Sequence, residues 1–164
     1  MPVSPLDYRY GREEAKQIWS REGRHARQLE VERALIWAHS KLGRVSPEHY
    51  DIIADIADPG IVTADRVDEI ELETRHDIMA LTKAMAEAAG EAGWCIHLGA
   101  TSNDIVDSAV ALQIKDSIKI QFETLSNLTL TLCDIAERES NTVMIGRTHG
   151  QAAVPTTVGK ELKV

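Results

Sequence analysis

Histidine is the side chain best suited to exchange protons near neutral pH, and this chain contains six histidines. Three of them stand in polar segments flanked by glycine or arginine: His76, His97 and His149. His149 lies between Thr148 and Gly150, after a short segment of extended character, so irregular backbone would present its ring to a ligand. The alternative interpretation is a turn histidine whose ring forms only a local hydrogen bond.

Three further groups of residues have the chemistry of anion-binding sites. Arg75–Asp77 opens a predicted helix, where donor side chains would lie beside the positive end of the helix dipole. Thr101 and Ser102 supply two hydroxyls at the start of a longer helix with free N–H groups. The pair Arg9–Tyr10 adds a bidentate guanidinium. Simpler interpretations stay open: a first-turn Asp77 beside exposed side chains, ordinary capping by Ser102, and an exposed pair in a flexible tail.

The remaining histidines and the cysteines indicate no further site. We expect His97 to be structural and partly buried, because Ile96 and Leu98 flank it. The other three histidines are expected on solvated, charge-rich helical surfaces: His25, His39 and His49. Cys95 and Cys133 have neither disulfide-framework nor metal-ligand spacing, and the sequence has no phosphate-binding glycine loop and no G-x-S-x-G motif. These observations favour an anionic substrate handled by acid–base chemistry, without a metal or an organic cofactor.

Helices separated by glycine and proline are predicted to position these residues. In the helix that begins near residue 24, we expect a buried face made of Leu29, Ala34, Leu35 and Ala38. Ser46 is expected to cap the next helix. The predicted helices cover about residues 12–22, 24–42, 47–57 and 75–89, with another beginning at Thr63 or Asp65.

A longer helix is predicted from residue 103 to about 140, where neither glycine nor proline occurs. At ~1.5 Å per residue it would be roughly 55 Å long, and Ser102 is its expected N-cap. Its apolar residues recur every three or four positions, as in a helix bundle, and we call them the apolar seam: Ile118, Phe122, Leu125, Leu128, Leu132 and Ile135. Residues 142–150 are expected to be extended, and Pro155–Thr157 to begin a last helix. A seam without partner helices and an end inside a helix, at Val164, lead us to expect a fragment.

The composition is that of a globular and mainly helical protein. Hydrophobic residues make up 43% of the chain, charged residues 27% and aromatic residues 4%, which favours packed helices over a β-sandwich. A net charge of −8 argues against non-specific nucleic-acid binding. Residues 1–10 lack the features of a secretory signal, and no segment approaches the ~20 apolar residues of a membrane helix. We therefore expect an all-α, cytoplasmic protein with neither a nucleic-acid nor a membrane partner.

Several segments resemble motifs of the adenylosuccinate lyase family, which belongs to the fumarase/aspartase superfamily. The first is His97–Ala109 (HLGATSNDIVDSA), and the second is Gly146–Gln151 (GRTHGQ) together with Pro155–Thr157. Thr74–Asp77 (TRHD) and Arg9–Tyr10 match two more family motifs in the same order. The second block is the most specific, because fumarases and argininosuccinate lyases usually follow Thr-His with Leu. The resemblance covers essentially the whole chain.

The resemblance implies a β-elimination that releases fumarate from adenylosuccinate, giving AMP, and from the succinyl-aminoimidazole-carboxamide ribotide of purine biosynthesis. A base removes a proton beside a carboxylate, an aci-carboxylate forms, and an acid protonates the nitrogen as the C–N bond breaks. His149 would be the general acid, with His76 supporting it and binding the substrate. The Arg9–Tyr10 pair would hold the nucleotide phosphate, and Thr101 with Ser102 a carboxylate or phosphate. The implied substrate-binding residues are Arg9, Tyr10, Arg75, Asp77, Thr101, Ser102, Thr148 and Gln151.

The chain departs from the family pattern at several positions. Ala152 stands where many relatives carry a second His, and Val154 where many carry Glu. Asn103 replaces a common Ser or Thr and brings the first block closer to the fumarase version. The family's catalytic base is a Ser in a later loop of the type Gly-Ser-Ser-x-Met-Pro-x-Lys-x-Asn, and no such loop occurs in these 164 residues.

The resemblance also implies three helical domains, the central one of which forms a homotetramer whose active sites draw on three subunits. Residues 1–98 would be the N-terminal helical domain, and residues 99–164 the start of the central helical-bundle domain. We expect the full-length protein to be a homotetramer and the 164-residue chain alone to be inactive. Two other interpretations stay open: another lyase of the superfamily, and a stand-alone helical protein that pairs with other chains through the apolar seam.

Overall fold

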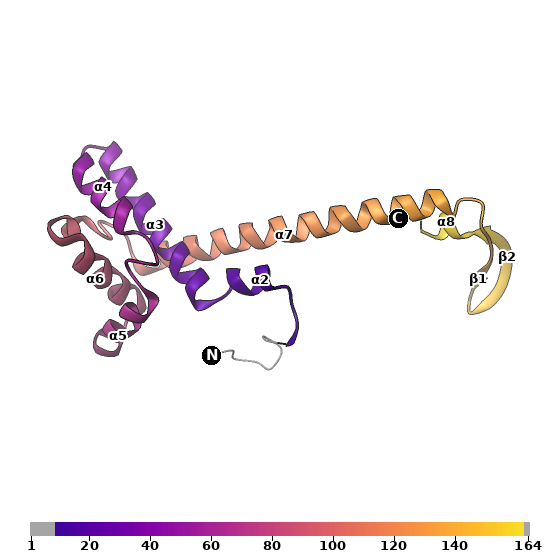
Figure 1. Cartoon of the computed structure of the whole chain (residues 1–164), viewed down its shortest axis with the longest axis horizontal. Helices are drawn as coiled ribbons and strands as arrows, with labels where there is room; N and C mark the ends of the chain where they lie inside the picture. Colours follow the sequence, from indigo (N-terminus) through magenta and orange to yellow (C-terminus); the bar gives the residue numbers. More distant parts are fainter. Residues whose placement is uncertain (1–8, 163–164) are drawn as a thin grey trace. The chain divides into compact units, whose positions relative to one another are not determined.

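The computed structural model describes residues 9–162, and within them the chain divides into two compact units between Ser117 and Ile118 (Figure 1). The first unit contains α2 (Glu13–Ile18), α3 (Arg21–Lys41), α4 (Pro47–Ile56), α5 (Ala64–Thr74), α6 (Asp77–Ala89) and the short 3-10 helix η1 (Gly90–Cys95). Helix α7 (Ser102–Arg138) begins in the first unit and continues into the second, which also holds β1 (Val143–Thr148), β2 (Gln151–Thr157) and α8 (Val158–Glu161). The predicted all-α class is confirmed, with one small sheet that was not expected.

Side-chain caps fix the helix starts of the first unit where the sequence predicted them. Ser46 Oγ accepts a hydrogen bond from the His49 N–H at 3.2 Å, and Thr63 Oγ1 accepts from the Arg66 N–H at 3.2 Å. Each bond satisfies one N–H group that the first turn of a helix leaves without a backbone partner. Both predicted caps are confirmed.

The break between the first two predicted helices lies about three residues earlier than expected. Residues 12–22 were expected to be continuous, but α2 ends at Ile18 and α3 starts at Arg21, with Ser20 accepting a hydrogen bond from the Gly23 N–H at 2.9 Å. The break brings Gly23 so close to α2 that an added Cβ would lie 2.2 Å from the Gln17 carbonyl oxygen. A Ser that caps and a Gly that allows close approach therefore end the first helix, although neither prevents helix formation in itself.

The buried face of α3 differs from the predicted one. Its buried residues recur at four- and three-residue steps: His25, Leu29, Glu32, Ile36 and His39. Of the four residues expected on that face, Leu29 is fully buried and Leu35 is half-buried, whereas Ala34 and Ala38 are exposed. The prediction that His25 and His39 are solvated is wrong, and His49 is half-buried. Three polar residues occupy the buried stripe because each finds a hydrogen-bond partner.

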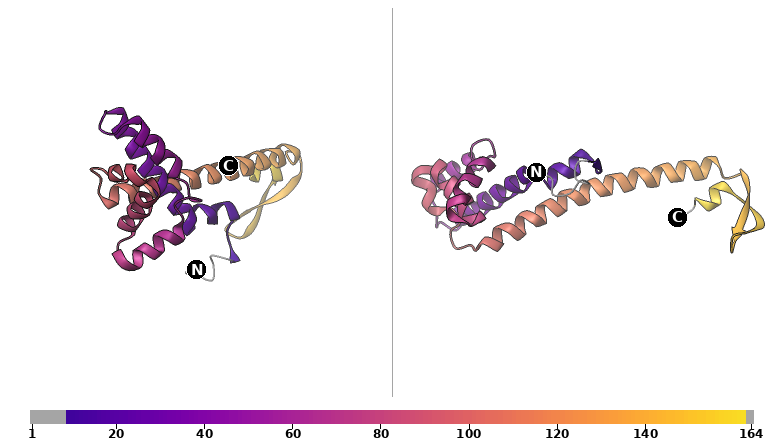
Figure 2. Two further views of the ribbon diagram at one scale, coloured as in Figure 1. Left: turned by 60° about the vertical axis from the view of Figure 1, so that its left-hand side comes forward. Right: turned by 90° about the horizontal axis from the view of Figure 1, so that it is seen from below.

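Helices α3 to α6 gather around one hydrophobic core in the first unit (Figure 2). Its largest fully buried apolar side chains, from α3 to α7, are Leu29, Ile36, Ile53, Val62, Ile78, Leu81, Met85, Cys95 and Ile105. Burying a side chain of this size stabilises a fold by about 1.5–3 kcal/mol. Because Ile105 and Ala109 are buried, the first turns of α7 belong to this core.

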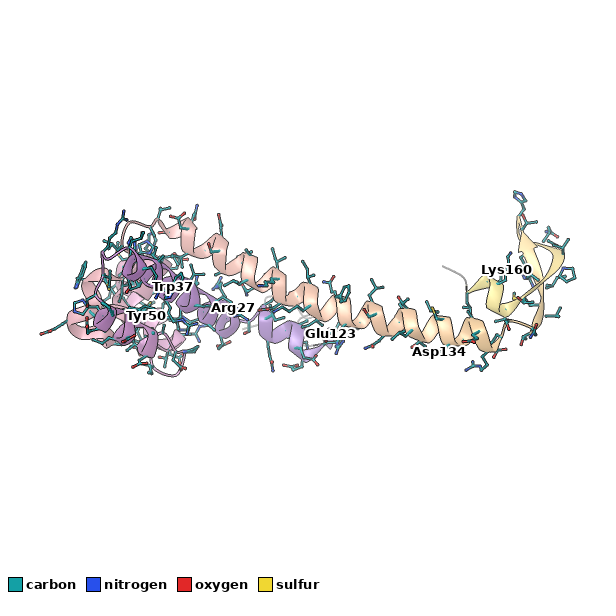
Figure 3. The ribbon with its side chains drawn as sticks, turned by 90° about the horizontal axis from the view of Figure 1, so that it is seen from above. Arg27, Trp37, Tyr50, Glu123, Asp134 and Lys160 are labelled. Atoms are coloured by element: carbon teal, nitrogen blue, oxygen red, sulfur yellow. The ribbon has the colours of Figure 1, made fainter. Side chains whose placement is uncertain are left out.

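Polar contacts also tie the first half of α7 to the N-terminal helices. Arg27 of α3, labelled in Figure 3, forms ion pairs with Glu30 and with Asp116 of α7. The Trp19 indole N–H donates to Ser117 Oγ at 2.9 Å. The division into domains after residue 98 stays a prediction, because compact units within one chain do not test which helices join a bundle. Within residues 9–162 no helix is both long and apolar enough to cross a membrane.

In the second unit, β1 and β2 form an antiparallel hairpin that pairs Val143 with Thr157 and Thr148 with Gln151. The two loop residues, His149 and Gly150, have φ angles of +49° and +76°. Positive φ at both central residues is the signature of a type I′ turn, whose twist matches that of the flanking strands. The predicted extended segment over residues 142–150 is therefore confirmed as far as Thr148 and closes in a tight turn.

The helix start predicted at Pro155–Thr157 is confirmed at Thr157, which is the N-cap of α8, whereas Pro155 and Thr156 lie in a strand. These residues belong to β2, and α8 starts at Val158, with Thr157 Oγ1 accepting from the Lys160 N–H at 3.3 Å. Proline is compatible with the strand because a two-stranded hairpin consists of edge strands, where one missing N–H is tolerated. Thr157 therefore ends the strand and caps the helix that follows it.

The apolar seam lies on α7 as predicted. Its first four residues are exposed by 52–70%, and its last two are half-buried, in the order Ile118, Phe122, Leu125, Leu128, Leu132 and Ile135. Such a row of exposed apolar side chains differs from the isolated apolar residues normal on a protein surface.

Candidate functional site

His76 caps α6 with its own ring. Helix α5 ends at Thr74, Arg75 adopts a left-handed conformation with φ +50°, and His76 is extended, so that α6 begins at Asp77. The Met79 N–H donates to His76 Nδ1 at 3.3 Å. Because Nδ1 accepts a hydrogen bond, the neutral ring carries its proton on Nε2. The predicted helix start at Arg75–Asp77 is confirmed, and the ring is oriented by the backbone it caps.

The structure brings His76 together with the start of α7. His76 Nε2 lies 3.4 Å from Ser102 Oγ, although the two residues are 26 positions apart in the sequence. Ser102 is the first residue of α7, and the preceding Thr101 donates its N–H to Asp104 Oδ2 at 2.8 Å. The N-termini of α6 and α7 therefore converge, and each supplies N–H groups and a positive dipole end. With 45% of the His76 side chain exposed, a ligand can reach this group.

Two buried side chains of α3 support the segment that leads into α7. Glu32 is fully buried, and its carboxylate accepts from the His97 N–H at 3.1 Å and from His97 Nδ1–H at 2.7 Å. His39 Nε2 donates to the Leu98 carbonyl at 2.8 Å. Burial raises the pKa of Glu32, and its hydrogen bonds with His97 oppose that rise. His97 is half-buried, as predicted, but its partner Glu32 was missed; a charged residue in register with Leu29 and Ile36 was the available signal.

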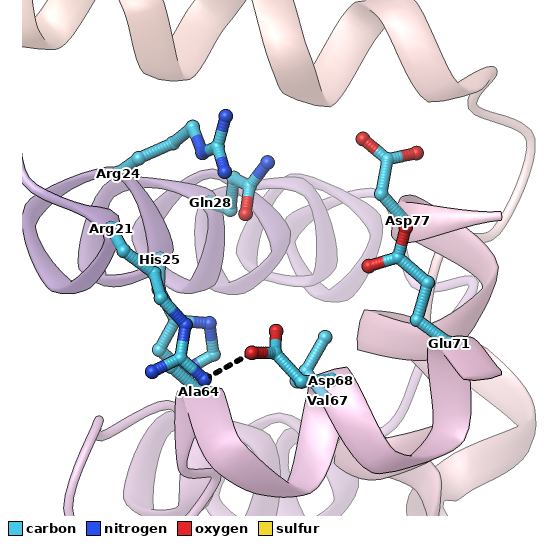
Figure 4. Close-up of a pocket in the computed structure, with 9 residues that line it drawn as sticks. All are labelled: Arg21, Arg24, His25, Gln28, Ala64, Val67, Asp68, Glu71 and Asp77. Carbon is cyan, nitrogen blue, oxygen red and sulfur yellow. Dashed lines mark ion pairs between the residues drawn. The ribbon is translucent and has the colours of Figure 1, made fainter. Parts of the chain in front are cut away.

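Asp77 faces a small polar cavity between α3 and α5 (Figure 4). The cavity measures about 50 Å³ and is lined by Arg21, Arg24, His25, Gln28, Ala64, Val67, Asp68, Glu71 and Asp77. Arg21 closes one side of it by pairing with Asp65 and Asp68. The Asp77 carboxylate also accepts from the Ile78 N–H at 2.7 Å, which stabilises the first turn of α6.

A second group of predicted residues lies on the hairpin of the second unit. His149 is exposed at the tip, and Thr148 and Gln151 flank it as the last paired residues of the two strands. The turn that presents His149 confirms that its backbone is irregular. Because the His149 group belongs to the second unit and the His76 group to the first, each has its own local geometry.

Arg9 and Tyr10 are exposed in the first unit, with 63% of Tyr10 accessible. Within residues 9–162, neither forms a hydrogen bond with the His76 group. In the same part of the chain, no three His, Cys, Asp or Glu side chains lie close enough together to hold a metal ion. Cys95 is buried and Cys133 is exposed.

A family model described as "Lyase" matches residues 8–164 of the chain. The chain is 50% identical over 159 residues to an adenylosuccinate lyase of Pyrococcus abyssi, a match that covers 97% of this chain and 35% of that protein. It is 40% identical over 154 residues to an adenylosuccinate lyase of Streptococcus mutans, covering 94% of this chain and 35% of that one. The chain therefore spans about a third of the length of these relatives.

Solved structures with the same fold are also enzymes. The chain superposes on a fumarate lyase from Mesorhizobium sp. BNC1 with a TM-score of 0.83 and 30% identity, covering 93% of this chain and 37% of that one. It superposes on a 3-carboxy-cis,cis-muconate lactonizing enzyme from Pseudomonas putida with a TM-score of 0.84 and 27% identity, covering 96% and 36%.

Proposed function

Because the chain belongs to the lyase family whose model matches residues 8–164, we propose that the full-length protein is an adenylosuccinate lyase. The observation that carries this proposal is the identity of 40–50% with adenylosuccinate lyases over nearly the whole chain. The approach of His76 to Ser102 at two helix N-termini adds a site suited to an anionic substrate. The reaction is a β-elimination that releases fumarate from adenylosuccinate and from the succinyl-aminoimidazole-carboxamide ribotide of purine biosynthesis.

In this proposal, His149 is the general acid that protonates the leaving nitrogen as the C–N bond breaks. Its exposure at the hairpin tip supports this role, because the ring is accessible and its backbone is fixed by a tight turn. Thr148 and Gln151, which flank the turn, contact the same substrate. The base that removes the carbon-bound proton is a Ser outside these 164 residues.

His76 binds a substrate carboxylate or phosphate and supports the acid. His76 Nδ1 accepts a hydrogen bond from the Met79 N–H, so the ring proton is on Nε2 and points away from the α6 backbone. This Nε2–H can donate to an anion in place of Ser102 Oγ. Thr101 and Ser102 add hydroxyl and N–H donors at the start of α7, and Arg75 adds a cation from the left-handed residue before His76.

The remaining roles follow from the same proposal. Arg9 and Tyr10 hold the nucleotide phosphate, and Asp77 maintains the start of α6 beside the substrate. The full-length protein is a cytoplasmic homotetramer, in which long helices such as α7 bury the apolar seam. Residues 1–98 form the N-terminal domain, and residues 99–164 begin the central one.

The proposal is tested by incubating the purified full-length protein with adenylosuccinate and quantifying AMP and fumarate by chromatography. We expect equimolar release of the two products. The 164-residue chain alone serves as the matched control and should release neither, because it lacks the base. Fumarate formed by the 164-residue chain would show that the base lies within it.

A parallel assay with argininosuccinate, aspartate and malate separates this proposal from other lyases of the superfamily. Turnover of one of these substrates without turnover of adenylosuccinate would replace the proposed function. Assembly without turnover of any of them would favour an interaction protein that pairs through the apolar seam.

A further inference from the structure

The segment between η1 and α7 contains two residues with left-handed backbone conformations. His97 has φ +61° and Gly99 has φ +72°. A left-handed conformation is easy for glycine but unfavourable for histidine, because the Cβ approaches the following carbonyl. Besides the local turn bonds Leu98 N–H to Cys95 and Ala100 N–H to His97, contacts from outside the segment help to keep His97 in this conformation.

Two side chains of α3 supply those contacts. Glu32 accepts hydrogen bonds from both the backbone N–H and the ring Nδ1–H of His97, and His39 donates to the carbonyl of the next residue, Leu98. Glu32 and His39 are seven residues apart, two turns of one helix, so they face the segment from the same side. Glu32 is fully buried, and its carboxylate lies 65 positions before His97 in the sequence.

The supported segment ends where the proposed substrate site begins. Thr101 follows it directly, and Ser102 lies 3.4 Å from His76 Nε2. From these contacts we infer that Glu32 is a positioning residue: by fixing the backbone and ring of His97, it places Thr101 and Ser102 beside His76. Its link to catalysis rests on the proposed function, whereas its effect on the geometry of Ser102 does not.

A residue that merely stabilises the core would behave differently from a positioning residue. Glu32→Gln preserves the size of the side chain but removes the charge and replaces one of the two oxygens, each of which accepts one bond from His97, with an NH2 donor. If Glu32 only fills the core, folded E32Q protein should have an unchanged α7 start and unchanged kinetics. If Glu32 positions the segment, E32Q should move Thr101 and Ser102 while the rest of the core keeps its packing.

The first measurement uses nuclear magnetic resonance on the isotope-labelled 164-residue chain. We expect the wild-type His97 ring to carry its proton on Nδ1, and we expect E32Q to shift the amide signals of Thr101 and Ser102. Glu22→Gln, at an exposed carboxylate of the same helix, is the matched control and should leave those signals in place. A wild-type ring protonated on Nε2 alone, or unchanged Thr101 and Ser102 signals in E32Q, would overturn the inference.

The second measurement compares kcat and KM for adenylosuccinate in the full-length protein. We expect E32Q to lower kcat/KM by about 10–100-fold, mostly through KM, because small displacements of binding groups have effects of this size. E22Q should match wild type. Folded E32Q protein with wild-type kcat/KM would contradict the inference. If wild type itself releases no fumarate, the proposed function fails and the spectra alone decide the role of Glu32.

A second variant with a shorter acidic side chain tests the inference if E32Q does not fold. Glu32→Asp keeps the charge but withdraws the carboxylate by one methylene, and we expect it to shift the same amide signals. If neither E32Q nor E32D folds, Glu32 is required for folding alone and the positioning role is rejected.

Discussion

The two regions that carry the candidate catalytic histidines are built in different ways. His76 caps a helix inside a unit with a continuous core, and buried side chains of α3 support the neighbouring segment 97–101. His149 lies at the tip of a two-stranded hairpin, exposed, with a type I′ turn as its local support. An isolated two-stranded hairpin is marginally stable in water at best.

The difference shows that a reactive side chain can be oriented by packing or by turn geometry alone. In the first unit, several tertiary contacts determine where His76 and Ser102 lie. In the second unit, two residues with positive φ determine where His149 points. We therefore expect substitutions in the first unit to change stability, and substitutions at the hairpin tip to change activity with little effect on stability.

The largest expected effect is a loss of kcat on substitution in the hairpin that carries His149. We expect His149→Ala to lower kcat of the full-length protein by about 10²–10⁴-fold, because a general acid contributes that much to a proton-transfer step. The melting temperature should stay unchanged, since the side chain is exposed. Val143→Ala, at a residue 73% exposed on the same hairpin, is the control and should retain activity. Near-normal kcat in H149A would remove the assignment of His149 as the general acid.

The second expected effect compares a buried side chain of the first unit with an exposed side chain of the apolar seam, by urea unfolding of the 164-residue chain. Leu29→Ala removes a fully buried side chain of α3 and should lower the free energy of unfolding by about 2–5 kcal/mol. Phe122→Ala removes a side chain that is 70% exposed on α7, and its effect should stay within about 0.5 kcal/mol. A large loss for F122A would mean that the apolar seam is already covered in the 164-residue chain, for instance by a second copy.

A pair of glycines tests turn geometry in both regions. Gly150 and Gly43 have φ angles of +76° and +69°, and no atom lies within 4 Å of a Cβ added to either. Alanine at each should cost about 1 kcal/mol of conformational strain. We expect G150A to lower kcat several-fold with unchanged melting temperature, and G43A to lower the melting temperature with unchanged kcat. The opposite pattern would show that the hairpin tip does not control the reaction.

The smallest expected effect is a pH dependence of the first unit. Burial raises the pKa of Glu32 above its unfolded value, so the folded state holds this proton more tightly than the unfolded state. The contribution of Glu32 to stability is therefore greatest below its unfolded pKa and is lost as the pH rises through its folded pKa. The melting temperature of E32Q minus that of wild type should therefore increase as the pH rises from 4 to 7. A constant difference would show that the pKa of Glu32 does not change on folding.

Local signals made much of the fold predictable. Ser46 and Thr63 marked helix starts, and Arg75–Asp77 marked the start of α6 next to its histidine. These features depend on hydrogen bonds between residues three or four positions apart, which the sequence order itself brings together. The break between the first two helices was predicted near Gly23 but lies at Ser20, because a capping residue inside a helical pattern competes with helix propagation and the packing of Gly23 against α2 decides the outcome.

The motif residues, the helical class and the start of α6 were thus determined by the sequence itself. The tertiary structure decided which face of α3 is buried, that Glu32 contacts His97, and that Pro155–Thr157 pairs with β1 before α8 begins. Glu32 and His97 are 65 positions apart, and their contact exists only because the helices between them fold back on one core. The register of Glu32 with Leu29 and Ile36 hints at its burial, but the pattern cannot identify the donors that make this burial tolerable.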